Sequence, residues 1–315
     1  MKRPKVEHQP LPRWPPRLVL NGLRHRESPH RNGSAAAAQA KIPRRRGRER
    51  IRGPHPADRR PVRVGDGHHV PTPRWTRHEY EANPKDAIAV AEANLIVQNG
   101  LGYDEFMNKL EQASPNPNRV VIDAGQALEY QANTANPHIW YQLNTMPRLA
   151  KMVAADLGKL DPTHAAYFQA RAHAFIQSLK PWDEAVARLK AAFHGRGAAV
   201  TEPVSDYLLQ EAGLDIKTPW AFQAAIMNGT DPSPQDVALQ TQLFTRHEVG
   251  VFCYNKQVVT NVTKMFLSLA RREHIPTVAV YETEPAGLTY QRWMLEETNG
   301  IYNALAHGTS LEAIS

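Results

Sequence analysis

The sequence predicts an α/β protein with two lobes, each built on a small parallel sheet flanked by helices, joined by one long helix. Short apolar segments such as LIVQ at 95–98 and VGVFCY at 249–254 alternate with amphipathic segments that are long enough for helices. This alternation is typical of parallel strands connected by crossover helices. Two such blocks lie on either side of a helical pattern at about 163–192, so we expect two lobes rather than one continuous sheet.

Composition excludes several classes of protein. The 315 residues are 42% hydrophobic and 22% charged, which are ordinary values for a globular chain. No apolar run reaches the roughly 18 residues that a membrane-spanning helix needs. The single cysteine, Cys253, excludes an intrachain disulfide framework and a cysteine-rich zinc site.

The first block is bounded by clear start and stop signals. Pro84 favours the start of a helix, because proline is well tolerated at the first helical position. Asn99-Gly100 is a turn signal, and Asp161-Pro162 ends a helix and begins the next one. The expected elements are helix 84–94, strand 95–98, helix 104–113, strand 119–122 and helix 145–160.

The second block follows the long helix predicted at 163–192, in which Pro181 predicts a kink or a break. Its expected strands are 198–201, 249–254 and 276–281, and its expected helices are 203–212, 234–246, 257–272 and 289–306. In open parallel sheets, ligands bind at the carboxyl ends of the strands. Polar residues that directly follow these strands are therefore the first candidates for a site.

The first 77 residues differ in character from the rest. They hold 20 Lys and Arg against 5 Asp and Glu, a net +15, whereas residues 78–315 hold the remaining 18 and 26, a net −8. With 12 prolines and no Phe or Tyr, this segment cannot bury enough apolar surface to fold, so we expect it to be disordered. The basic residues near the start are followed by prolines rather than an apolar stretch, so no signal peptide is expected there.

Three interpretations of this basic Arg/Pro-rich segment compete. A disordered tail and a mis-translated stretch of GC-rich DNA fit its composition equally well. A nucleic-acid-binding arm fits less well, because the segment has no Phe or Tyr interleaved with the arginines for base stacking. The predicted organisation is this segment at 1–77, an incomplete N-terminal lobe at 78–161, a linking helix at 162–192 and a C-terminal lobe at 193–315.

Five polar residues are candidates for a site. His78 precedes the first helix of the N-terminal lobe, and His138 follows the second strand and its loop. Glu202 directly follows the strand at 198–201, and Glu282 and Glu284 close the last strand. Each residue alone is weak evidence for a site. Glu202, for example, precedes Pro203 and also fits the carboxylate that often stabilises the start of a helix. Together, two imidazoles and one or two carboxylates fit Zn²⁺, Mn²⁺ or Fe²⁺.

The order of several motifs resembles the metal-binding solute-binding proteins of zinc and manganese ABC transporters. The motifs are HEYEANPKDA, NGLGYDEFMNKL, NPHIWY, LDPTHAAYFQARAHAFIQSL, TEPVSDYLLQEAGL and IPTVAVYETEPAGLTYQRWM. The resemblance runs from about Trp75 to the C-terminus and implies a divalent cation held between two lobes by four side chains. It also implies a strand, a helix and a strand before His78, where this chain has the Arg/Pro-rich segment.

Carried over by position, the resemblance implies His78, His138, Glu202 and Glu284 as metal ligands. Glu282, two residues earlier on the same predicted strand face, is the alternative to Glu284. Asn136 stands where family members often have Asp, and no His-rich loop separates the first two ligands. Two imidazoles and two carboxylates suit Mn²⁺ as well as Zn²⁺.

The resemblance implies a cation-capture protein that is not an enzyme. The expected partners are a divalent cation, Zn²⁺ or Mn²⁺, carried as cargo and the membrane permease of an ABC transporter, with no nucleic acid. A monomer located in the periplasm or at the cell surface is expected. Two alternatives stay open, namely a metal-dependent hydrolase with Glu202 or Glu282 as general base and a polyanion-binding protein acting through residues 1–77.

Overall fold

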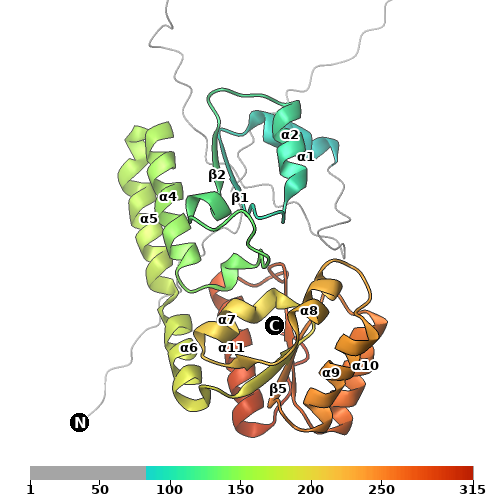
Figure 1. Ribbon diagram of the computed structural model, residues 1–315. Coiled ribbons are helices and arrows are strands. Elements are labelled where there is room, and N and C mark those ends of the chain that lie inside the picture. The colour runs from blue at the N-terminus through green and yellow to red at the C-terminus, as the bar shows by residue number, and fades with distance from the viewer. Residues whose placement is uncertain (1–82, 315) are drawn as a thin grey trace, which may run out of the picture.

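The structure of the protein is a computed structural model that describes residues 83–314 (Figure 1). Within these residues, two parallel sheets lie in two lobes, and helices cover both (Figure 1). This arrangement confirms the predicted fold class. The segment 1–77, for which disorder was predicted, lies outside the described residues, as does His78.

The described part of the N-terminal lobe contains a two-stranded sheet. Strands β1 (Leu95–Gln98) and β2 (Val120–Asp123) pair in parallel, with Val97 opposite Ile122. Leu95 and Ile122 pack on helices α4 (Thr145–Leu160) and α5 (Ala165–Ser178). The other face packs, through Ile96, on α1 (Pro84–Glu92) and α2 (Glu105–Ala113).

The predicted linking helix is present as two helices. Helix α5 ends at Ser178 and α6 (Lys180–Phe193) begins at Lys180, with Pro181 in its first turn. Phe168 on α5 belongs to the core of the N-terminal lobe, whereas Trp182 on α6 belongs to the core of the C-terminal lobe. The two helices therefore carry the chain from one core to the other.

The C-terminal lobe contains a four-stranded parallel sheet in the order β4-β3-β5-β6. Its strands are β3 (Gly197–Val200), β4 (Asp215–Ile216), β5 (Val251–Asn255) and β6 (Thr277–Val280). Beyond the last helix, Leu311 pairs with β6, because its N–H donates to Thr277 O at 2.8 Å and its carbonyl accepts from Ala279 N at 2.7 Å. The final residues thus extend this sheet.

Helices flank both faces of this sheet (Figure 1). Helix α10 (Asn261–Arg272) packs with α8 (Trp220–Met227) and α9 (Pro234–Thr245) through the rings of Phe222, Phe244 and Phe266. Phe244 and Phe266 also contact the ring of Phe252 on β5. On the other side, α11 (Tyr290–His307) packs against α6. In the described part of the chain, every helix is too short or too polar to cross a membrane.

The structure moves several predicted boundaries and adds short elements. The helix predicted from 257 begins at Asn261, because the Thr260 side chain caps it by accepting from Thr263 N. The helix predicted at 203–212 begins as the 3-10 turn η4 (Pro203–Ser205) and continues as α7 (Asp206–Glu211). The last strand ends at Val280 rather than at 281. Elements without a predicted counterpart are β4, α8, the short helix α3 (Ala124–Ala127) and the 3-10 helices η2 (Ile139–Tyr141) and η3 (Pro162–His164).

Candidate metal centre

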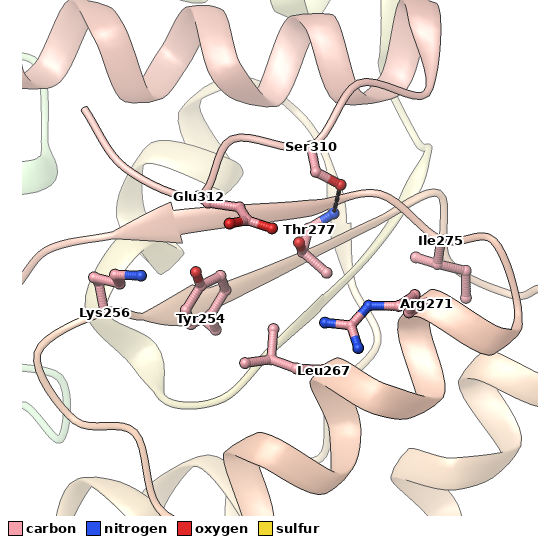
Figure 2. A pocket seen from close by; sticks show the side chains of 8 residues that line it. All are labelled: Tyr254, Lys256, Leu267, Arg271, Ile275, Thr277, Ser310 and Glu312. Carbon is pink, nitrogen blue, oxygen red and sulfur yellow. Dashed lines mark hydrogen bonds between the residues drawn. The ribbon is translucent and has the colours of Figure 1, made fainter. Parts of the chain in front are cut away.

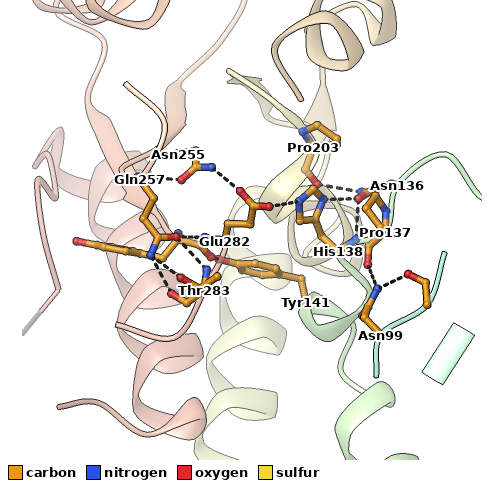
Figure 3. Close-up of polar contacts among 12 residues, drawn as sticks. Asn99, Asn136, Pro137, His138, Tyr141, Pro203, Asn255, Gln257, Glu282 and Thr283 are labelled. Atoms are coloured by element: carbon orange, nitrogen blue, oxygen red, sulfur yellow. Dashed lines mark hydrogen bonds and ion pairs between the residues drawn. The ribbon is translucent and has the colours of Figure 1, made fainter. Parts of the chain in front are cut away.

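His138 lies where the two lobes meet, and its side chain is completely buried. The 3-10 helix η2 that follows it spans the boundary, since Ile139 packs in the core of the N-terminal lobe and Tyr141 in the core of the C-terminal lobe. The loop that precedes it is held to the N-terminal lobe by Asn99, whose Nδ2 donates to Pro137 O at 3.0 Å (Figure 3).

Asn136 fixes the ring of His138. Its Oδ1 accepts from the backbone N–H of His138 at 3.0 Å and lies 2.7 Å from the ring atom Nδ1 (Figure 3). Its Nδ2 donates to Pro203 O at 2.9 Å, so the amide is oriented with the oxygen towards the ring. Because an amide oxygen can only accept, the ring hydrogen lies on Nδ1, and in the neutral ring the lone pair lies on Nε2.

The Nε2 atom of His138 faces Glu282. Its distance to Glu282 Oε1 is 3.9 Å (Figure 3). The other carboxylate oxygen, Oε2, accepts from Asn255 Nδ2 at 3.2 Å. Asn255 is the last residue of β5 and is fully buried, so it orients the Glu282 carboxylate from within the sheet.

The turn that carries Glu282 is held by Gln257. The Oε1 atom of Gln257 accepts from the backbone N–H groups of Glu282 and Thr283, both at 2.9 Å. Its Nε2 donates to Thr283 Oγ1 at 2.7 Å and to Thr283 O at 3.3 Å (Figure 3). This turn follows the end of β6 at Val280, so strand alternation does not place Glu282 and Glu284 on one face as we expected.

The remaining predicted ligands differ in their placement. Glu202 follows β3 and is 5% exposed. It directly precedes Pro203, whose carbonyl oxygen accepts the hydrogen bond from Asn136 Nδ2. Glu284 is partly buried, burial raises the pKa of its carboxyl, and among the described residues it forms neither a hydrogen bond nor an ion pair. His78 lies outside the described residues.

The structure therefore brings His138 and Glu282 together and places Glu202 on a segment bonded to the same loop. Within residues 83–314, no three His, Cys, Asp or Glu side chains are grouped closely enough to hold a metal ion. The ligand set remains a prediction. Supporting residues that the sequence analysis did not identify are Asn255 and Gln257, although a polar residue ending the apolar segment VFCYN was a usable signal for Asn255.

A separate surface pocket lies between β5, α10 and the C-terminal segment (Figure 2). Its lining residues are Tyr254, Lys256, Leu267, Arg271, Ile275, Thr277, Ser310 and Glu312. None of the predicted ligands that lie within residues 83–314 lines this pocket, so it is distinct from the pair formed by His138 and Glu282.

Comparison with known proteins identifies the family. The sequence model of a family described as zinc-uptake complex component A, periplasmic, matches residues 71–304, which is well over half of the chain. The chain belongs to this family. The predicted resemblance to solute-binding proteins of zinc and manganese ABC transporters is thereby confirmed.

Several relatives of this zinc-uptake family member carry metal-binding names. The manganese-binding lipoprotein MntA of Halalkalibacterium halodurans is 32% identical over 111 residues, which cover 34% of this chain and only 36% of MntA. The high-affinity zinc uptake system protein ZnuA of Bacillus subtilis is 20% identical over 72% of this chain and 77% of its own length. The first name denotes manganese binding and the second denotes zinc uptake.

A solved structure supports the fold of this family member. The solute-binding protein FpvC of Pseudomonas aeruginosa, in complex with Mn²⁺, has a TM-score of 0.59 and 24% identity. The alignment covers 73% of this chain and 86% of FpvC. At this identity the similarity establishes the shared two-lobed architecture.

Proposed function

We propose that this chain captures a divalent cation, Zn²⁺ or Mn²⁺, between its two lobes and delivers it to the permease of an ABC transporter. The observation that carries the proposal is the pairing of His138 with Glu282 across the lobe boundary, with Nε2 facing the carboxylate at 3.9 Å. Family membership supports the same function. The periplasm or the cell surface is the proposed location, because several relatives are named as substrate-binding lipoproteins of ABC transporters.

The proposed ligands are His138, Glu202 and Glu282, with His78 as the fourth. Glu282 replaces Glu284 as the first choice because Glu282 faces His138, whereas Glu284 has no bonded partner among the described residues. Two imidazoles and two carboxylates are compatible with both Zn²⁺ and Mn²⁺. Four protein ligands leave no open position for a reacting water, which favours capture over hydrolysis.

The test is a calorimetric titration of chelator-treated protein with Zn²⁺ and with Mn²⁺. We compare the wild type with Glu202→Gln, Glu282→Gln and Glu284→Gln, since each change removes a charge and keeps the shape of the side chain. The affinity of E202Q and E282Q should fall by more than the roughly 10- to 100-fold that the loss of a supporting residue costs. E284Q is the matched control and should bind like the wild type.

Two results would change this assignment. A wild-type chain that binds neither metal contradicts cation capture itself. Loss of affinity in E284Q, with E282Q unaffected, would instead restore Glu284 as the ligand.

Metal binding should also weaken as the pH falls through the range in which a free imidazole is protonated, about 6.5, because the metal competes with protons for the same ring atoms.

A further inference from the structure

A buried carboxyl group connects the two segments that carry His138 and Glu282. Tyr141 lies three residues after His138, and Tyr281 directly precedes Glu282. The hydroxyl of Tyr141 lies 2.8 Å from Tyr281 O and 2.7 Å from Glu297 Oε2. Tyr141 and Glu297 are both completely buried.

The second oxygen of Glu297 is also bonded. Its Oε1 accepts from the backbone N–H of Tyr281 at 2.9 Å and from Trp293 Nε1 at 2.6 Å. Glu297 therefore connects helix α11 by hydrogen bonds to both the end of β6 and the 3-10 helix η2. A second contact strengthens the same junction, since the Tyr290 hydroxyl donates to Trp140 O at 2.6 Å.

A count of hydrogens indicates that Glu297 is protonated. A phenol has a single hydrogen, yet the Tyr141 oxygen lies within hydrogen-bonding distance of two other oxygens. If Glu297 is ionised, one of these two contacts has no hydrogen. If Glu297 is neutral, its Oε2–H donates to Tyr141, the Tyr141 O–H donates to Tyr281 O, and every group is satisfied.

The surroundings of Glu297 agree with this count. Burial raises the pKa of Glu297 to about 8, and this effect outweighs the hydrogen bonds with Tyr141, Trp293 and Tyr281, which lower the pKa. The titratable groups that face it are Tyr141 from η2, Tyr281 from the end of β6 and Cys253 from β5. Burial raises the pKa of each of these groups, so all three are neutral near pH 7 and none supplies a compensating positive charge.

We propose that Glu297 is a positioning residue of the metal centre, a neutral buried acid that holds the His138 segment and the Glu282 segment at a fixed separation. This inference rests on the proposed cation capture. Glu297 contacts neither proposed ligand directly and acts through Tyr141 and Tyr281. Preformed ligands bind a metal more tightly than ligands that must first be ordered, which is how such a residue affects affinity.

Three variants test the inference in the full chain. Tyr141→Phe removes the bridging hydroxyl, and Glu297→Leu removes the carboxyl. Glu297→Gln replaces the acid O–H with an amide N–H and keeps the acceptor oxygen, so it reproduces the neutral acid. The dissociation constant for Zn²⁺ or Mn²⁺ should rise about 10- to 100-fold in Y141F and E297L and stay at the wild-type value in E297Q.

The matched control is Thr298→Val, one residue further along α11. Thr298 Oγ1 accepts from Trp182 Nε1 at 3.1 Å, a buried bond to α6 that does not involve the ligand segments. Urea unfolding with chelator present should show that T298V and Y141F lose similar stability. Only Y141F should lose metal affinity. Y141F also keeps the test informative if E297L fails to fold.

Three outcomes would overturn the inference: wild-type affinity in Y141F, equal loss of affinity in T298V, or equal loss in E297Q and E297L. A wild type that binds no metal overturns the proposed function, which is a different result from a binding wild type with an unaffected Y141F. An infrared measurement without metal adds an independent check. The difference spectrum between the wild type and E297Q at neutral pH should show a protonated carboxyl band, because the partly protonated Asp206 is present in both proteins and cancels. The absence of this band from the difference spectrum contradicts the neutral acid.

Discussion

Asn136 determines which ring nitrogen of His138 can bind a cation. The Asn136 oxygen accepts from Nδ1, and the Asn136 amide is itself held by Pro203 O. The lone pair of the neutral ring is then on Nε2, the atom that faces Glu282. Loss of such a supporting partner typically reduces metal affinity about 10- to 100-fold.

The first prediction concerns this partner. Asn136→Ala should weaken Zn²⁺ binding within that range, because the ring can then rotate and change its tautomer. Asn136→Asp keeps an oxygen that accepts from Nδ1–H and should retain most of the affinity. Competition with a metallochromic chelator measures both. Equal affinities for the wild type and N136A would show that the ring is held by other contacts.

The second prediction concerns the pH dependence of stability. In the folded protein Glu297 has a pKa of about 8, above the ordinary value of 4.5, so the folded state holds its proton more tightly than the unfolded state. The stabilisation from this group is fully present below about pH 4.5 and is lost as the pH rises to about 8, at about 1.4 kcal/mol per pKa unit.

Glu297→Gln does not titrate and should remove this contribution. Urea unfolding of metal-free wild type and E297Q across the same pH window gives the difference. Asp206, whose pKa burial raises to about 7, is present in both proteins and cancels. Two parallel stability curves would contradict the raised pKa of Glu297.

Among the elements, the turn after β6 depends on one exposed side chain. Gln257 accepts from two backbone N–H groups and donates to Thr283, and it thereby orders the turn that presents Glu282. The side chain of Gln257 is itself exposed. Its contribution should therefore be larger for the metal site than for the core.

The third prediction follows from that position. Gln257→Ala should lower metal affinity about tenfold or more, within the range for supporting residues, while the urea midpoint changes little. Lys256→Ala changes the exposed neighbouring residue and is the control. A large fall in the urea midpoint of Q257A, accompanied by unchanged metal affinity, would reverse the roles assigned here.

The elements differ in how well the sequence predicts them. Apolar segments such as 95–98 and 249–254 specified β1 and β5 to within two residues, because burial on both faces requires continuous apolar residues. Strand β4 has only two residues, and α8 is apolar on all sides, so neither produces a clear periodic pattern. The long helix breaks at Leu179, two residues before Pro181, which predicted a kink or a break there.

The candidate site was predictable in its strand ends but not in its geometry. Asn136 and Pro203 are 67 residues apart, and no local pattern reveals the bond between them. The choice between Glu282 and Glu284 depends on a turn, where the two-residue period of a strand no longer applies. The helical period does contain a signal for Glu297, because this residue shares the buried face of α11 with Trp293 and Ile301, four residues before and after it.

For the whole molecule, the fourth prediction is that metal stabilises the folded chain. A cation that bridges two lobes binds the folded state only, so 100-fold excess over the dissociation constant adds about 2.7 kcal/mol. Thermal unfolding after chelator treatment should therefore shift upward with Zn²⁺ or Mn²⁺. His138→Ala should abolish the shift, and His173→Ala, an exposed histidine on α5, should preserve it. A full shift in H138A would place the cation elsewhere.

The C-terminal segment also covers an edge of the C-terminal sheet. An unpaired edge strand is a template for aggregation, and natural sheets protect such edges with short strands or added segments. Here β4 has only two residues at one edge, and Leu311 occupies the backbone groups of β6 at the other. A version shortened before Ser310 should form light-scattering aggregates on mild heating sooner than the full chain, and tags fused at this end should be attached through a flexible spacer.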